Sequence, residues 1–125
     1  MIIKESGEDY LEAILVIKNK AGFVRSIDVA NELEVSKPSV SVAMKHFREE
    51  GYVVVDKDGY LDLTDKGLAI AKRVYERHEI ISEVLMRLGV SQEVALEDSC
   101  KIEHAISEES FEKIKEFLVR LKKED

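Results

Sequence analysis

The sequence has a single cysteine, Cys100, and no apolar run long enough to cross a membrane. A lone cysteine excludes an intramolecular disulfide, and a reducing compartment would keep its thiol available as a ligand. A membrane-spanning helix needs about 20 consecutive apolar residues, and the charged start of the chain does not fit a secretory signal. We therefore expect a cytoplasmic protein that makes no contact with a membrane.

Motifs typical of several enzyme classes are also missing. The chain has no glycine-rich phosphate loop, no H-E-x-x-H and no C-x-x-C. In a cysteine hydrolase His104 would activate Cys100, but no glycine turn beside the thiol offers an oxyanion hole. The 125 residues suffice for one compact domain, or for a small module joined to an assembly segment. We expect a protein that is not an enzyme.

One segment lacks acidic residues altogether. The formal net charge of −7 argues against non-specific binding to a polyanion, because such binding needs Lys and Arg to displace counterions from phosphates. Residues 35–48 contain no acid and carry Lys37, Lys45 and Arg48. This local basic stretch is therefore the place where nucleic acid could bind.

Apolar periodicity and capping residues predict six helices and one hairpin. The fold class that we expect is mainly α, with an N-terminal winged helix-turn-helix and its small β-hairpin wing (residues 1–64), followed by an α-helical half (residues 65–125). The first four predicted helices are 6–21, 26–33, 36–50 and 65–88. Ser91 caps a fifth helix, which runs through residues 98–107, and Ser107 caps the last one, which ends at Lys122-Lys123. The predicted hairpin pairs 52–55 with 60–63 around an Asp-Gly turn.

Two short helices followed at once by a hairpin are typical of the winged helix-turn-helix, whose second helix enters the major groove of DNA. Hydroxyl groups near its N-terminus can contact base edges, and a proline can contact a thymine methyl group. Basic side chains nearby can contact phosphates, although taken alone they equally fit a solvated surface. The candidate DNA-binding residues are Arg25, Ser36, Lys37, Pro38, Ser39, Ser41, Lys45, Arg48 and Lys57.

A second group of residues points to metal chemistry. Cys100, Glu103 and His104 share one face of a helix, because positions i, i+3 and i+4 lie together. Thiolate, carboxylate and imidazole are ligands that suit a divalent transition metal. A structural alternative would bury Cys100 as a small apolar residue and leave Glu103 and His104 as surface neighbours.

Three residues on other helices could belong to the same group. Asp9 and Glu12 lie three residues apart on the first predicted helix, and His78 lies on the long one. Asp9 also fits a capping box with Ser6, whereas Glu12 has no such structural explanation. For His78 the alternative is an exposed histidine paired with an acid.

Several of these stretches together resemble the diphtheria toxin repressor family of metal-dependent transcriptional regulators, close to its manganese-transport-regulator branch. The resemblance covers residues 5–118 in the expected order. It is carried by residues 8–14 (EDYLEAI), 24–30 (VRSIDVA), 35–40 (VSKPSV), 63–67 (LTDKG), 77–79 (RHE) and 103–107 (EHAIS).

The resemblance implies that residues 65–125 are an α-helical metal-binding and dimerisation domain. It thus implies a homodimer with a metal site between the two halves of each chain. The implied ligands are Asp9, Glu12, His78, Cys100, Glu103 and His104. The manganese type has a glutamate where this chain has Cys100, whereas the iron type has cysteine there but methionine in place of Asp9. Because thiolate favours softer ions, we slightly favour Fe(II) over Mn(II), and whether the site holds one ion or two stays open.

The chain also departs from the iron type. Ser82 and Leu96 stand where the second, ancillary metal site of that type would need a carboxylate and a histidine, so we do not expect that site. The chain ends soon after its last helix, so we do not expect the SH3-like domain either.

The function that follows is a repressor of metal-uptake genes that binds a palindromic double-stranded DNA operator, with the divalent metal as corepressor. Two alternatives stay open. One is a winged-helix regulator that needs no metal and responds to an organic ligand or to oxidation of Cys100. The other is a helical protein-interaction module that uses the same fold without DNA.

Overall fold

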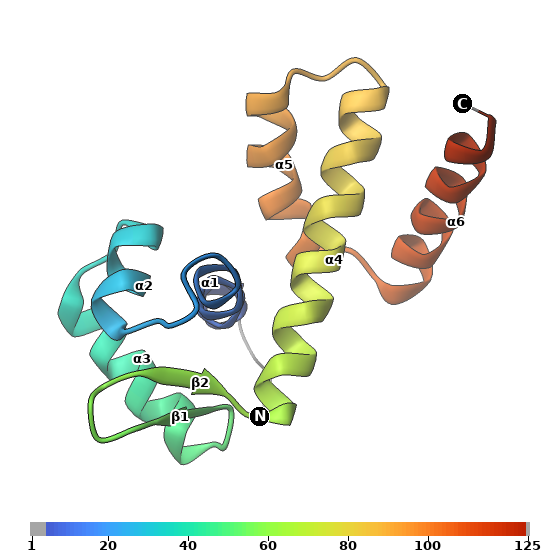
Figure 1. The fold of residues 1–125 in the computed structure, drawn as a ribbon. Coiled ribbons are helices and arrows are strands. Elements are labelled where there is room, and N and C mark those ends of the chain that lie inside the picture. The colour runs from blue at the N-terminus through green and yellow to red at the C-terminus, as the bar shows by residue number, and fades with distance from the viewer. Residues whose placement is uncertain (1–4, 125) are drawn as a thin grey trace. The chain divides into compact units, whose positions relative to one another are not determined.

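The computed structural model describes residues 5–124 and consists of two compact units, Met1–Arg73 (unit 1) and Val74–Asp125 (unit 2). The mainly helical fold with one small hairpin confirms the predicted fold class. Unit 1 contains α1 (Glu5–Ala21), α2 (Ser26–Leu33), α3 (Lys37–Glu49), β1 (Val53–Val55), β2 (Leu61–Leu63) and the first turns of α4 (Asp65–Arg87); unit 2 contains the rest of α4, α5 (Gln92–Ala105) and α6 (Glu108–Glu124), as Figure 1 shows.

Hydroxyl side chains begin four of the helices, as predicted. Ser36 Oγ accepts from the backbone N–H of Ser39 at the start of α3, and Thr64, Ser91 and Ser107 make the equivalent bond at the starts of α4, α5 and α6. Each bond satisfies one of the N–H groups that a helix N-terminus leaves without an intrahelical partner. The alternative capping box of Ser6 with Asp9 involves a side chain outside the described part of the structure, and the backbone of α1 is already helical at Glu5.

Two residues with positive φ lie at the two ends of the second helix of the helix-turn-helix, one before α3 and one after it. Glu34 ends α2 with φ 55°, and its N–H donates to the carbonyl of Ala30. Gly51 follows α3 with φ 82°, a conformation that glycine adopts without steric cost. The chain can therefore reverse twice within a short distance.

The wing is a two-stranded antiparallel hairpin in which Val53 pairs with Leu63 and Val55 with Leu61. Asp56 Oδ1 accepts from the N–H groups of Asp58 and Tyr60 and so closes the turn. The segment before α2 adds to this sheet, because Leu61 N–H donates to Val24 O at 2.8 Å and Arg25 forms a bridge with Tyr60.

Unit 1 has one continuous apolar core formed by α1, α2, α3, the hairpin and the start of α4. Its fully buried centre includes Leu11, Ile14, Val24 and Val40. Gly67 in the first turns of α4 lies against this core: a Cβ there would come within 2.1 Å of Tyr52 O. Only glycine allows this close approach of backbone to backbone.

Unit 2 has a smaller apolar interior. The portion of α4 within it runs beside α5 in Figure 1. Among the described residues, three ion pairs join α4 to α6: Arg77 with Glu108 at 2.8 Å, Lys115 with Glu76 at 3.1 Å and Lys122 with Glu83 at 3.3 Å. The Glu76 carboxylate raises the pKa of Lys115. Across residues 5–124, no helix is both long enough and apolar enough to span a bilayer.

Candidate metal centre and nucleic-acid interface

The acid-free segment, residues 35–48, provides all of α3 except its last residue, Glu49, and this helix buries one face and exposes the other. Val40, Met44 and Phe47 are buried, whereas all nine candidate DNA-binding side chains are exposed. Val42, which the sequence argument did not single out, is 71% exposed. The sequence could have indicated this exposure. Val42 lies two residues from both Val40 and Met44, and this spacing puts it on the opposite face of the helix from those two buried side chains.

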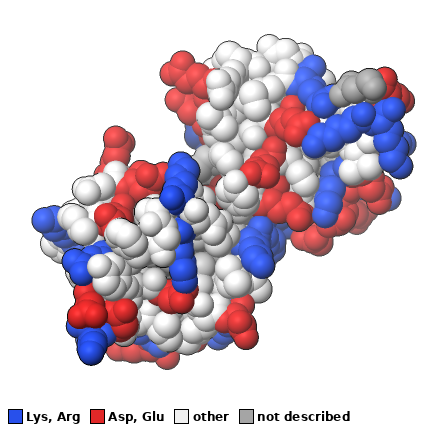
Figure 2. All heavy atoms as spheres, in the orientation of Figure 1, with Lys and Arg blue, Asp and Glu red and all other residues white. Residues whose placement is uncertain are grey.

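Some of these nine residues also have structural contacts. Ser36 caps α3, and its hydroxyl lies 2.7 Å from that of Ser39. The Arg25 guanidinium lies over the Tyr60 ring, 4.3 Å from its centre. In Figure 2, acidic and basic side chains are both scattered among uncharged ones over the visible surface, so any attraction to a polyanion depends on local clusters such as that of α3.

The predicted metal ligands of unit 2 come together around Glu103. This residue is 1% exposed, and its Oε2 accepts from Nδ1 of His78 at 2.8 Å. In a neutral imidazole a proton on Nδ1 makes Nε2 the nitrogen that can ligate a cation. The pairing of His78 with an acid is therefore observed, but that acid is buried and the His78 side chain is only 27% exposed.

Cys100 and His104 complete this group. One potential ligand atom from each of Cys100, Glu103 and His104 lies within 4.8 Å of the others, and His104 Nε2 lies 3.5 Å from Glu103 Oε1. The structural alternative is wrong: Cys100 is exposed, whereas Glu103 and His104 have side-chain exposures of 0% and 4%.

This arrangement fits a divalent cation. Glu103 Oε1 is buried and accepts no hydrogen bond from the residues that the structure describes. Burying a carboxylate without full compensation is unfavourable, and a divalent ion near Oε1 would offset its charge. A thiol, two imidazoles and this carboxylate form a donor set for a transition metal.

Asp9 and Glu12 lie in unit 1, on consecutive turns of α1, and both are partly buried. Their neighbour Glu8 is buried and forms an ion pair with Arg73 in the first half of α4. That ion pair offsets the like charge that Glu8 brings to Glu12, four residues away.

Two residues that the sequence argument gave no role contact the ligands of unit 2. Ser99 is fully buried, and its Oγ lies 3.4 Å from Nδ1 of His78. Arg77 is buried and donates to the carbonyl oxygen of Glu103 at 3.2 Å. Helical spacing could have indicated both, since Ser99 precedes Glu103 by four residues and Arg77 lies three residues after the buried Val74.

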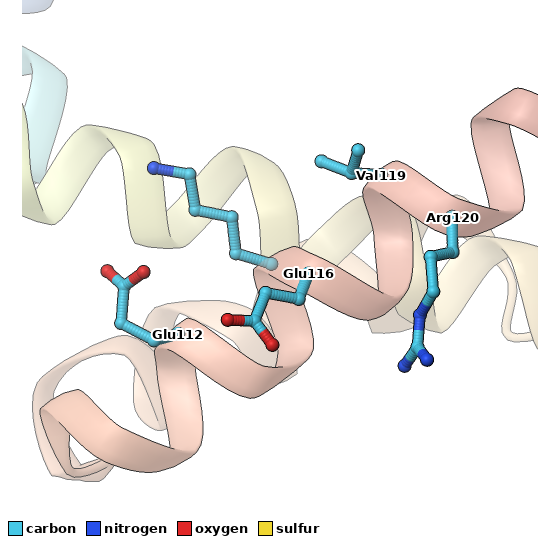
Figure 3. Close-up of a pocket in the computed structure, with 5 residues that line it drawn as sticks. Glu112, Glu116, Val119 and Arg120 are labelled. Carbon is cyan, nitrogen blue, oxygen red and sulfur yellow. The ribbon is translucent and has the colours of Figure 1, made fainter.

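A separate hollow of about 400 Å³ lies along α6. Its lining residues are Glu112, Lys115, Glu116, Val119 and Arg120 (Figure 3). All of them belong to one helix and most are charged, so the hollow lacks the converging walls of a ligand site. We assign it no ligand.

Comparison with known proteins identifies both halves of the chain. Residues 3–66 match the iron dependent repressor N-terminal DNA binding domain, and residues 64–124 match the iron dependent repressor metal binding and dimerisation domain. The two matches meet at the start of α4.

Individual relatives agree with this assignment. An uncharacterized HTH-type transcriptional regulator of Methanocaldococcus jannaschii is 34% identical over 96% of this chain and 98% of its own length. The HTH-type transcriptional regulator MntR of Bacillus subtilis is 32% identical over 96% of this chain and 84% of its own.

Among solved structures, that of the manganese regulator SloR superposes with a TM-score of 0.79 at 29% identity. The match covers 94% of this chain but 54% of SloR, so the chain spans about half of that protein's length. These matches, which agree with the winged helix and the candidate metal centre, show that the chain belongs to the iron-dependent repressor family of metal-dependent transcriptional regulators.

Proposed function

We propose that this protein is a metal-activated repressor of metal-uptake genes, in which a divalent ion raises the affinity of a homodimer for a palindromic DNA operator. The observation that carries this proposal is the buried Glu103 carboxylate, which His78, Cys100 and His104 surround in unit 2. The DNA-binding half comprises residues 1–64 and the metal-binding and dimerisation half residues 65–125. The partner DNA gives the protein a cytoplasmic location, and we propose no catalytic role.

On the DNA side, α3 enters the major groove. The exposed N-terminal residues of α3 (Lys37, Pro38, Ser39 and Ser41) contact bases, with Ser36 beside them. Arg25, Lys45, Arg48 and Lys57 contact phosphates, which position a protein on the duplex without reading its sequence. The exposure of all nine side chains supports these roles.

On the metal side, His78, Cys100, Glu103 and His104 hold the ion together with Asp9 and Glu12 of α1. The contacts within unit 2 support the first four ligands, and the family resemblance supports Asp9 and Glu12. A bound divalent cation supplies positive charge that offsets these carboxylates and the thiolate. By linking residues from the two halves, the ligands fix the orientation of each winged helix so that the two α3 helices match half-sites one helical turn apart.

The deciding experiment is an operator titration by gel shift with and without excess chelator. Coupling free energies between an effector site and a ligand site are typically about 1–3 kcal/mol, or 5- to 150-fold in affinity. We expect Mn(II) or Fe(II), added anaerobically, to raise operator affinity within this range. Equal affinity with and without metal contradicts the proposal and favours the regulator that responds to an organic ligand or to cysteine oxidation.

Cys100 provides a test of metal choice. It is exposed, and a thiolate there shifts preference toward softer ions, so we propose Fe(II) ahead of Mn(II). Cys100→Glu should improve activation by Mn(II) relative to Fe(II), and Cys100→Ser provides the matched control that removes the thiol without adding a charge. An unchanged preference in both variants shows that Cys100 does not choose the metal.

The double variant Lys37→Glu, Arg48→Glu separates DNA binding from a protein-interaction role. Both side chains are exposed on α3, so the fold should persist while operator binding is lost through repulsion from the phosphates. Glu49→Lys with Glu112→Lys is the control with two charge reversals of the opposite sign. Operator binding that survives the first double variant favours the protein-interaction module.

Exposed apolar residues of unit 2 support the homodimer. Leu88 is 72% exposed, and Val94 and Leu96 on α5 are 44% and 40% exposed. Apolar exposure of this kind is typical of surfaces that another protein covers. Leu88→Glu combined with Leu96→Glu should yield monomers in sedimentation analysis, and an unchanged dimer places the interface on another face.

A further inference from the structure

Arg77 is a buried charge that lies outside the proposed ligand set. It is 6% exposed, and its guanidinium contacts two other helix ends. Nη1 donates to the carbonyl oxygens of Glu103 at 3.2 Å and Ile106 at 2.8 Å, and Nη2 pairs with Glu108 Oε2 at 2.8 Å. Its Cζ lies 5.2 Å from the centre of the Phe111 ring. One side chain of α4 thus holds the end of α5 and the start of α6.

The acceptors of Arg77 are groups that a helix cannot satisfy by itself. The last four carbonyl groups of a helix have no intrahelical donor, and Glu103 lies within the last four residues of α5, which ends at Ala105. A helix C-terminus also carries partial negative charge, which a cation stabilises. The fixed, planar donors of an arginine can serve two carbonyl oxygens and a carboxylate at once, which a lysine ammonium does less well.

Glu103 is therefore held at two points by consecutive residues of α4. Arg77 donates to its backbone carbonyl, and His78 donates to its carboxylate. The backbone contact fixes where the Glu103 side chain starts, and the side-chain contact fixes where it points. Because His104 follows Glu103 directly, the same contact fixes the backbone that carries the second imidazole.

We propose that Arg77 is a positioning residue for the metal centre, which holds the end of α5 so that Glu103 and His104 are arranged for a cation before it binds. The proposal rests on the metal-binding function proposed above. Groups that support the ligands of a metal site typically change metal affinity 10- to 100-fold when they are removed. Loss of Arg77 should therefore weaken metal binding even though every ligand remains.

The test measures binding of Mn(II) and Co(II) to the full chain by calorimetry, the visible spectrum of the Co(II) form, and the melting temperature of the metal-free protein. Three variants are compared with the wild type. Arg77→Met removes all donors and keeps the aliphatic volume, Arg77→Lys keeps the charge, and Glu108→Gln removes only the charge of the partner on α6.

Arg77→Met should bind Mn(II) at least tenfold more weakly and give a shifted Co(II) spectrum, Arg77→Lys should recover part of the affinity, and Glu108→Gln should stay within threefold of the wild type. A role confined to stability would lower the melting temperature of Arg77→Met while leaving metal affinity and the Co(II) spectrum unchanged, and that result overturns the proposal.

If Arg77→Met does not fold, Arg77→Lys decides: wild-type affinity and spectrum in that variant overturn the proposal, and weaker binding supports it. Wild-type protein that binds neither ion overturns the proposed function itself, and the proposal with it.

Discussion

The two units of this chain have interiors of different chemistry. Of the 18 buried apolar residues among those that the structure describes, 13 belong to the core of unit 1 and the remaining five, Val74, Ile81, Ala95, Phe111 and Leu118, to unit 2. Of the five buried polar residues in the same described set, four belong to unit 2: Arg77, Ser82, Ser99 and Glu103. Unit 1 is stabilised by apolar burial, whereas the interior of unit 2 is arranged around charge.

The two kinds of interior, apolar in unit 1 and charged in unit 2, would serve a regulator in different ways. An apolar core gives the winged helix one fixed shape that does not depend on an effector. A buried carboxylate, by contrast, is unfavourable unless it is compensated, so the stability of unit 2 can respond strongly to a cation. The following substitutions test the comparison, beginning with the largest expected effect.

Leu11→Ala should have the largest effect on stability. Leu11 is fully buried at the centre of the unit 1 core, and truncation of such a leucine typically costs about 2–5 kcal/mol because a cavity remains. Urea unfolding followed by circular dichroism measures the loss. The control Val42→Ala, at a position 71% exposed, should change stability by less than about 0.5 kcal/mol, and a similar loss in both variants contradicts the assigned core.

Gly67→Ala should destabilise unit 1 by about 3 kcal/mol, because the new Cβ would meet Tyr52 O at 2.1 Å and one backbone segment would have to move. The control is Gly22→Ala, where φ is 88° but no atom lies within 4 Å of the added Cβ. We expect it to cost about 1–2 kcal/mol from the backbone conformation alone. Thermal unfolding of both variants separates the steric effect from the conformational one.

Glu103→Gln should affect the metal-bound and metal-free proteins differently. The amide keeps the shape of the side chain and can still accept from His78, so the metal-free protein should melt at the same temperature or higher. Stabilisation by metal should disappear; for the wild type it is about 2.7 kcal/mol at a free ion concentration of 100 Kd. Thermal melts with Mn(II) and with chelator measure both effects, and a variant that metal still stabilises shows that Glu103 is not a ligand.

Lys18→Met should have the smallest effect. Lys18 Nζ donates to Asp62 Oδ1 at 2.5 Å on the surface of unit 1, and this hydrogen bond lowers the pKa of Asp62 from its ordinary value of 3.8. Because both side chains are well exposed, screening by solvent limits the contribution of this ion pair to the free energy of unfolding to about 0.5 kcal/mol.

The pH dependence of this ion pair follows from the direction of the shift. A carboxyl group with a lowered pKa in the folded state stabilises the fold above 3.8, and this contribution is lost as the pH falls through the lower, folded-state value. Wild type and Lys18→Met should therefore differ in urea unfolding at pH 6 and converge near pH 2. A difference that persists at pH 2 points to a packing effect of the lysine stem instead.

Much of the fold could be predicted because its signals are local. The caps at Ser36, Thr64, Ser91 and Ser107 each act over three residues, and the change from helical to alternating periodicity at residue 52 marks the hairpin.

The candidate metal cluster was predicted only in part. Helical spacing places Cys100, Glu103 and His104 on one side of α5, but spacing does not decide which of them faces the interior. The structure buries Glu103 and exposes Cys100, the reverse of what their polarity alone favours. His78 comes to Glu103 from 25 residues away, and no local pattern encodes that contact.

The sequence by itself determined where helices begin and end, where the wing turns, and which segment is free of acids, because capping, glycine conformations and short-range charge act between neighbours in the chain. Only the tertiary structure decided that the carboxylate of Glu103 would occupy the interior of unit 2, where His78 donates to it and Arg77 donates to the backbone carbonyl of the same residue. Such burial depends on groups from separate helices satisfying one another's hydrogen bonds and charges, and that compensation exists only once those helices have packed.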